Sequence, residues 1–317
     1  MKRRGLVWLV VLLTLHVVAG AVVAAAAPRT AIVFAAFEPA GYRSDLFTIR
    51  PNGTGVANLT NTPNMDEQWP SFSRDGTKIV FRRGNVDRWE TTEIYTIDRD
   101  GGHRTRVTHN DAADSSPQWT PNGRRVVFMS NRNDADPTCM DWPCNWDIFT
   151  ARADGSHVRQ LTTSTAQDVF PTVSPDGQKV LFQRMGASSA ASALWVMDID
   201  GSNSHRLTAP ALKAGGAAWS PDGSRIAFQD QACRACGQSD IWLIDADGSD
   251  PVRVTDTVAN ETNVGWSPNG ESLVVQVDLG QHSGIDRMRA DGSHRSHVTL
   301  PEHGDAFEPS WAPAAGS

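Results

Sequence analysis

The 317-residue sequence predicts an all-β fold, a six-bladed β-propeller with four-stranded antiparallel blades. Two interleaved motifs support this prediction. The first reads roughly P-x-W-S-P-D-G ahead of an apolar run, and the second is an acidic-apolar-aromatic stretch followed by D-G. Copies of the first lie 46 to 54 residues apart, the period of a propeller blade, with their glycines at Gly76, Gly123, Gly177, Gly223 and Gly270.

Each repeat divides into four short predicted strands. The Pro-Asp-Gly and Asp-Gly steps favour turns, because proline fixes the first φ of a turn and glycine accepts a positive φ. The runs between the turns are β-branched or aromatic, as in residues 225–228 (R-I-A-F). The second motif occurs six times, with its centres at Phe47, Tyr95, Phe149, Trp195, Trp242 and Ile285.

The two ends of the repeat region predict closure of the ring. The first predicted strand, residues 31–34, corresponds to the second strand of a blade. A truncated last copy of the first motif, Pro309 to Pro313, supplies the missing first strand. We expect this C-terminal segment to complete the first blade, which would pair two otherwise open sheet edges. Residues 28–317 then form a single propeller.

Residues 1–27 are typical of a signal peptide. A basic start is followed by the apolar run of residues 6–18 and by alanines at positions 24–27. The alternative is an uncleaved membrane anchor, because residues 6–27 are uncharged and long enough to span a bilayer. Both interpretations place residues 28–317 outside the cytoplasm, in the cell envelope or secreted, with no membrane span after the leader.

Charge and cysteine content narrow the possible partners. The chain has 36 acidic and 29 basic residues, a formal charge of -7, which argues against nucleic-acid binding. Cys139 with Cys144, and Cys233 with Cys236, form two local pairs, and an oxidising compartment favours disulfides. Other pairings stay open. A redox role for Cys233 and Cys236 would need a helix N-terminus, and this pair lies in a predicted hairpin loop.

The paired motifs resemble the WD40-like Pro-Asp-Gly (PD40) repeats of TolB-type six-bladed propellers over roughly residues 30 to 313. TolB carries an additional α/β domain ahead of its propeller, whereas only residues 28–30 separate the leader from the first strand here, so the resemblance implies a propeller without that domain. It also implies a protein-binding scaffold, a propeller fused to a peptidase, or a sugar lyase with a metal site. The fold does not decide among these functions.

Carboxylates recur where one predicted blade leads to the next. They lie seven positions before each W-S-P proline, with Ala214 in the fourth repeat and an offset of one residue in the last. These acids can simply bond to a neighbouring blade, or they can form a negative ring that attracts cations or a basic peptide. The five candidates are Glu67, Asp114, Asp168, Glu261 and Asp305.

Tryptophans gather on the loops of the same predicted face. The longest loop, residues 131–146, holds Trp142 and Trp146 around the first cysteine pair, and Trp89 lies on another loop. Rigid tryptophans are typical interface anchors. The alternative is that they pack against the stems of their loops. By contrast, the face with the Pro-Asp-Gly turns is monotonous, which suggests a structural role.

We therefore expect a non-catalytic binding scaffold that engages a protein or peptide, for example a basic one, through the loop face and the channel mouth. The sequence contains no nucleophile elbow, and we expect no catalytic residue, metal or cofactor. Alternatives are a carbohydrate-active lyase or hydrolase that uses the channel, and a sensor of small solutes or cations. His109, His282 and His303 are the histidines that can approach the channel. The sequence does not fix the ligand or the oligomeric state.

Overall fold

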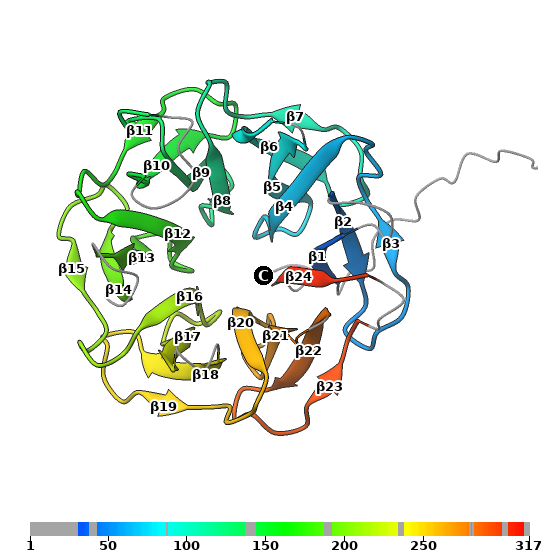
Figure 1. The fold of residues 1–317 in the computed structure, drawn as a ribbon, viewed down its shortest axis with the longest axis vertical. Coiled ribbons are helices and arrows are strands. Elements are labelled where there is room, and N and C mark those ends of the chain that lie inside the picture. The colour runs from blue at the N-terminus through cyan, green and yellow to red at the C-terminus, as the bar shows by residue number, and fades with distance from the viewer. Residues whose placement is uncertain are drawn as a thin grey trace, which may run out of the picture.

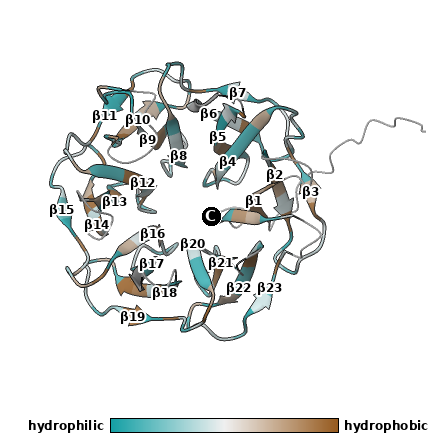
Figure 2. Cartoon of the chain, in the orientation of Figure 1, coloured by the Kyte–Doolittle hydropathy of each residue, from teal (hydrophilic) through white to brown (hydrophobic). Residues whose placement is uncertain are grey.

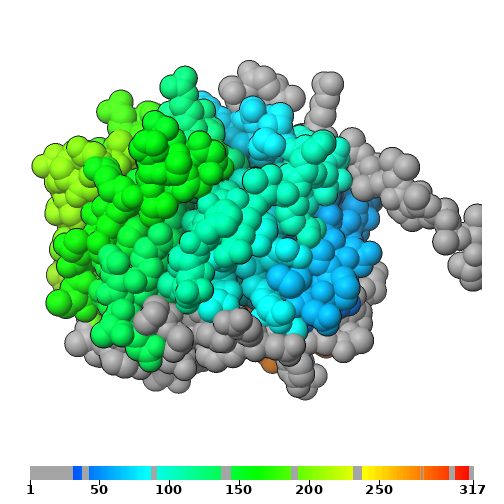
Figure 3. Space-filling view, turned by 90° about the horizontal axis from the view of Figure 1, so that it is seen from above, coloured from blue at the N-terminus to red at the C-terminus, as the bar shows by residue number. Residues whose placement is uncertain are grey.

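The computed structural model describes residues 31–37, 43–86, 88–136, 144–186, 192–233, 238–278, 280, 282–299 and 304–313. The regular structure in these residues consists entirely of β-strands. Six four-stranded antiparallel sheets surround a central axis (Figure 1). Viewed from the side, the ring is a squat cylinder (Figure 3). The predicted all-β, six-bladed propeller is therefore confirmed.

Within each blade the first three strands, counted outward from the axis, are long, and the outermost has two residues. Blade B contains β4 (Met65–Phe72), β5 (Lys78–Asn85), β6 (Arg88–Asp98) and β7 (Thr105–Arg106). Blade C contains β8 (Asp114–Trp119), β9 (Arg125–Ser130), β10 (Asp147–Arg152) and β11 (Arg159–Gln160). Blade D contains β12 (Gln167–Val173), β13 (Lys179–Met185), β14 (Ser192–Asp198) and β15 (His205–Arg206). Blade E contains β16 (Ala214–Trp219), β17 (Arg225–Cys233), β18 (Gln238–Asp245) and β19 (Val252–Arg253). Blade F contains β20 (Asn260–Trp266), β21 (Ser272–Asp278), β22 (Ser283–Arg289) and β23 (Ser296–His297).

Blade A joins segments from both ends of the described chain. It consists of β24 (Ala306–Trp311), β1 (Ile32–Phe37), β2 (Ser44–Ile49) and β3 (Ala57–Asn58), in that order from the axis. The antiparallel register pairs Ile32 with Trp311 and Ala36 with Ala306. This confirms that the C-terminal strand completes the first blade, and it covers the inner edge of β1.

The hydrophobic core lies between blades rather than inside one of them. Successive side chains of a strand point to opposite faces of the sheet, so each blade packs against two neighbours. Ile32 and Phe34 of blade A, for example, pack against Val274 and Ile285 of blade F. Burial of such a side chain contributes about 1.5–3 kcal/mol. Figure 2 shows the hydrophobic residues concentrated on middle strands such as β9 and β18, whereas β11 and β15 are hydrophilic.

The two repeated motifs form the turns at one rim of the ring. In the Pro-Asp-Gly turn, the Ser73 hydroxyl donates to Asp75 Oδ1 at 2.6 Å, and Asp75 also accepts from the Thr77 amide at 3.0 Å. In the Asp-Gly turn, Gly155 has a φ of 83°, and a Cβ there would lie 2.1 Å from the Val107 carbonyl oxygen of the preceding blade. Glycine is therefore required both by the turn and by the contact between blades.

The structure shifts the centre of one predicted motif copy by one residue. The sixth copy of the second motif was centred on Ile285, but the residue opposite the blade's central buried side chain is Asp286, which pairs with Val275 as Phe47 pairs with Phe34. The predicted leader, residues 1–27, lies outside the described residues. Within the described part of the chain, no helix has the length and apolar character needed to cross a membrane.

Candidate functional site: the central channel

The innermost strand of every blade contains a β-bulge. In β4, Trp69 and Pro70 lie opposite the single residue Phe81 of β5. The first bulge residue has a positive φ in each blade. The second is proline in four blades, which is tolerated because the residues of a bulge leave the hydrogen-bond ladder. We call the six first residues the bulge ring: Trp69, Ser116, Phe170, Gly216, Asn263 and Glu308.

The bulge ring lines a cavity of about 460 Å³ in the channel. The ring centroids of Trp69 and Phe170 lie 5.0 Å apart, although blade C separates their blades. These two side chains therefore meet in front of the small Ser116 of blade C and narrow the channel there. On blade E, Gly216 contributes no side chain to the wall. Because the six members differ in size and polarity, the cavity is asymmetric within a pseudo-symmetric ring.

The Glu308 carboxylate is the acidic member of the bulge ring. It is 9% exposed, and its Oε2 accepts a hydrogen bond from the Trp69 amide at 2.6 Å. In two other blades a second-strand glutamine binds the corresponding amide, as Gln276 does for the Glu308 amide at 3.3 Å. Blade A has Ala35 at that position, so Glu308 supplies the acceptor itself. Burial raises the pKa of Glu308 to about 8, against the opposing effect of its bond to Trp69.

The cavity extends to the rim that carries the Pro-Asp-Gly turns. The proline before the Asp or Asn of these turns lines it in four blades, Pro313 lines it in blade A, and Arg74 occupies this position in blade B. Arg74 Nη1 donates to the Pro175 carbonyl of blade D at 2.6 Å and so reaches past blade C at the mouth. The expectation that this rim is purely structural is therefore too narrow, because it opens into the channel cavity.

The predicted acids lie beside this cavity, not on its walls. The side chains of Glu67, Asp114, Asp168 and Glu261 are 0% exposed, and each forms a salt bridge with an arginine. Asp168, for example, binds Arg184 through both oxygens at 2.6 and 2.7 Å, and Arg184 lies 4.3 Å from the centre of the Trp195 ring. This geometry favours the structural alternative for these four acids. Their role in partner binding stays a prediction.

Asp305, the acid offset by one residue, has a different environment. Its side chain is 39% exposed and accepts a hydrogen bond from the Ser283 amide at 3.0 Å, and His282 Nδ1 lies 3.3 Å away.

Burial also changes the acidity of the enclosed carboxyl groups. It raises the pKa of Asp168 and of Glu67. It raises the pKa of Asp147 to about 6, and the nearby charge of Asp168 acts in the same direction.

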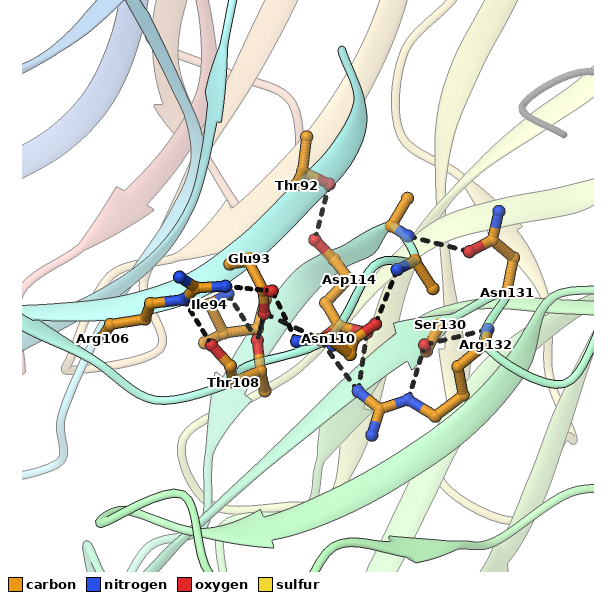
Figure 4. A network of polar contacts seen from close by, with 12 residues as sticks. Thr92, Glu93, Ile94, Arg106, Thr108, Asn110, Asp114, Ser130, Asn131 and Arg132 are labelled. Carbon is orange, nitrogen blue, oxygen red and sulfur yellow. Dashed lines mark hydrogen bonds and ion pairs between the residues drawn. The ribbon is translucent and has the colours of Figure 1, made fainter. Parts of the chain in front are cut away.

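Figure 4 shows how one such acid connects two blades. The carboxylate of Asp114 accepts from Arg132 at 2.8 Å and from Asn110 Nδ2 at 2.8 Å. The Asn110 amide donates in turn to Glu93 of blade B at 2.8 Å, and the Thr92 hydroxyl donates to the Asp114 carbonyl at 3.0 Å. The Asp114 carboxylate thus joins Arg132 of blade C to Glu93 of blade B through Asn110.

The structure describes two of the predicted aromatic and cysteine residues, Trp146 and Cys144. Trp146 is 5% exposed and packs with Ala113 and Val169 between blades C and D, as the alternative of packing at the loop stem predicts. Cys144 is buried and disulfide-bonded, but its partner lies outside the described residues. The pairing of the cysteines therefore stays a prediction. The other predicted residues, outside the described side chains, are Trp89, Trp142, Cys139, Cys233 and Cys236.

The histidines do not gather into a site within the described residues. His109 and His282 lie there, whereas His303 lies outside them. Among the described residues, no group of three or more His, Cys, Asp or Glu side chains is arranged to hold a metal ion. Sequence reasoning missed the bulge ring, although its signal is present: four of its six members immediately precede the first proline of the P-x-W-S motif.

Comparisons with known proteins agree with the propeller fold. The model of the TolB beta propeller domain family (PD40) matches residues 16–221. An uncharacterized protein of Agrobacterium fabrum is 31% identical over 156 residues, which is 47% of this chain and 49% of that protein. A protein TolB homolog of Chlorobium luteolum is 25% identical over 138 residues, 44% of this chain and 28% of the homolog. The chain thus spans about half or less of these curated relatives.

Solved structures show the same fold at low sequence identity. TolB from Acinetobacter baumannii superimposes with a TM-score of 0.73 at 20% identity, covering 90% of this chain and 67% of TolB. A putative TolB from Agrobacterium tumefaciens gives a TM-score of 0.64 at 19% identity, over 89% of this chain and 98% of that one. Because the family model covers more than half of the sequence and all six blades are present, this chain belongs to the TolB beta propeller domain family.

Proposed function

We propose that the protein is an extracytoplasmic, non-catalytic binding scaffold whose channel cavity receives a segment of a protein or peptide partner. The observation that carries the proposal is the contrast between repeated and unrepeated positions. Turn residues recur from blade to blade because each blade needs them, whereas the six members of the bulge ring share a backbone conformation and no side-chain chemistry. A binding site needs such local variety, and a structural ring does not.

The cavity has the properties of a recognition site. Aromatic side chains dominate its middle, and a few polar groups, among them Glu308 and Asn263, can orient a ligand. The loop face with Trp89 and Trp142 would supply further contacts, and Asp305 is the exposed acid that a basic partner segment could meet. The four buried acids would hold the blades in place. An extracytoplasmic location follows from the predicted leader and accords with the family.

The proposal is tested by filling the cavity. Ser116→Trp places a large side chain on the bulge ring, at a residue that already has a positive φ, while Thr77→Trp adds the same bulk to an exposed turn as the control. Full-length protein is immobilised and used to select from a library of random linear peptides. We expect peptides that bind the wild type and Thr77→Trp but lose at least tenfold in affinity for Ser116→Trp, at an unchanged melting temperature. Equal affinity for all three proteins contradicts the proposal.

A further inference from the structure

Blade C departs from the charge pattern of its neighbours at one pair of strand residues. At the turn end of the second and third strands, a cation lies opposite an aspartate in three blades: Lys78 and Asp98, Lys179 and Asp198, Arg225 and Asp245. The first two pairs form salt bridges of 2.6 and 3.0 Å. In blade C the equivalent residues are Arg125 and Arg152, two like charges directly opposite each other. Such a pair is destabilising when nothing neutralises it.

Arg125 of this pair lines a cavity of about 620 Å³ between blades C and D. Arg124, Arg125 and Arg159 contribute to its wall, and Arg74 reaches it from blade B. Across the described residues, neither Arg124 nor Arg125 nor Arg159 has a carboxylate within salt-bridge distance. We call these four residues and their cavity the arginine pocket.

Two carboxylates of blade D also line this pocket, and both are already bound by their own turns. Asp176 accepts from the Ser174 hydroxyl at 2.6 Å and from the Gln178 amide at 3.0 Å. Asp200 accepts from the hydroxyl and the amide of Ser202 at 2.6 and 2.9 Å. Four arginines thus face two carboxylates, a local positive excess in a chain whose formal charge is -7.

We propose that the arginine pocket binds a small anionic ligand that carries phosphate groups. The planar guanidinium group presents paired donors that match the oxygens of a phosphate, and its positive charge is permanent. The volume lies within the range of small-molecule sites and exceeds the need of a single phosphate. An anion bound at Arg125 would also offset the repulsion between Arg125 and Arg152. This proposal is independent of the channel function.

The test uses inorganic pyrophosphate as the probe, with orthophosphate in parallel, at an ionic strength held constant with sodium chloride. Isothermal titration calorimetry on the full chain is expected to give saturable binding, tighter for pyrophosphate. Arg124→Gln with Arg159→Gln removes two exposed cations from the pocket and is expected to weaken binding at least tenfold. The matched control, Lys78→Gln with Lys179→Gln, removes two cations from the equivalent paired sites and should change affinity less than twofold. Absent saturable binding, or an equal loss in the control, overturns the proposal.

Arg152→Asp provides a second variant, which should raise the stability of the protein while it lowers the affinity for pyrophosphate. It restores the cation–aspartate pair of blades B, D and E, so we expect a higher melting temperature without ligand. The same change should reduce pyrophosphate affinity, because Arg125 gains a carboxylate partner. The rise in melting temperature that pyrophosphate produces should therefore be smaller in Arg152→Asp than in the wild type. Unchanged affinity in a folded Arg152→Asp protein counts against the arginine pocket as the site.

Discussion

Replacement of Glu308 by glutamine should make the protein more stable at alkaline pH while leaving it nearly unchanged in acid. Glutamine keeps an oxygen that can accept the Trp69 amide proton, the bond that Glu308 makes at 2.6 Å, and it removes the ionisable group. The native carboxyl has a pKa of about 8 because it is buried, whereas the ordinary pKa of a glutamate is 4.5. Between these values the folded protein holds a proton that the unfolded chain releases.

The size of the effect follows from the linkage between proton binding and folding. Because the folded state binds more protons in this interval, the free energy of unfolding of the wild type falls as pH rises from 4.5 to 8. At about 1.4 kcal/mol per pH unit, the interval between the two pKa values amounts to about 5 kcal/mol above pH 8, as an upper value. Glu308→Gln does not bear this cost, so its advantage over the wild type should grow across the same window.

Urea unfolding at a series of pH values from 4 to 9 measures this difference. Glu271→Gln, at an exposed turn position of blade F, serves as the control and should follow the wild type. The quantity to compare is the difference between Glu308→Gln and wild type at each pH, which cancels the other titrating groups. A difference that is the same at pH 5 and pH 9 would refute the assignment of a buried, protonated Glu308.

Three further substitutions separate structural residues from binding residues. Asp168→Asn breaks a buried pair and leaves Arg184 without its carboxylate, so it should lower the free energy of unfolding, measured in urea, by about 3 kcal/mol. Asp305→Asn changes an exposed site and should lower it by less than about 1 kcal/mol. Equal losses would contradict the difference in burial. Trp146→Ala should cost about 3–5 kcal/mol, since the indole fills the space between blades C and D; a cost below about 1 kcal/mol would return Trp146 to the exposed anchors.

The fold could be predicted almost completely because its determinants are local and repeated. Each turn motif specifies its own backbone through side chain-to-backbone bonds, such as those of Ser73 and Asp75, and six copies at one period leave few architectures. The position of the closing strand followed from the phase of the repeat. The one misplaced centre, Ile285, lies in the copy that lacks both the usual acid and the aromatic residue, so nothing in that segment marked the register.

The candidate site was harder to predict because it depends on partners distant in sequence. The four buried acids near the start of inner strands were found by counting, but their burial depends on arginines such as Arg184, 16 residues away on another strand. The bulge ring depends on a backbone conformation that residues as different as Trp69 and Glu308 adopt, so side-chain type gives no indication of it. Trp146 appeared to be a loop residue, yet the neighbouring blade encloses it.

The closing strand also determines when the ring of blades can close during folding. β1 must wait for β24, whose residues leave the ribosome about 270 positions later, and contacts of such sequence separation form slowly. Until then five blades can assemble while the sixth presents the bare inner edge of β1, the state most exposed to association with another chain. The same strand carries Glu308, so the channel receives its carboxylate only when the ring is sealed. A chain that stops before Ala306 would lack both the closing strand and the carboxyl group of Glu308 in the channel cavity.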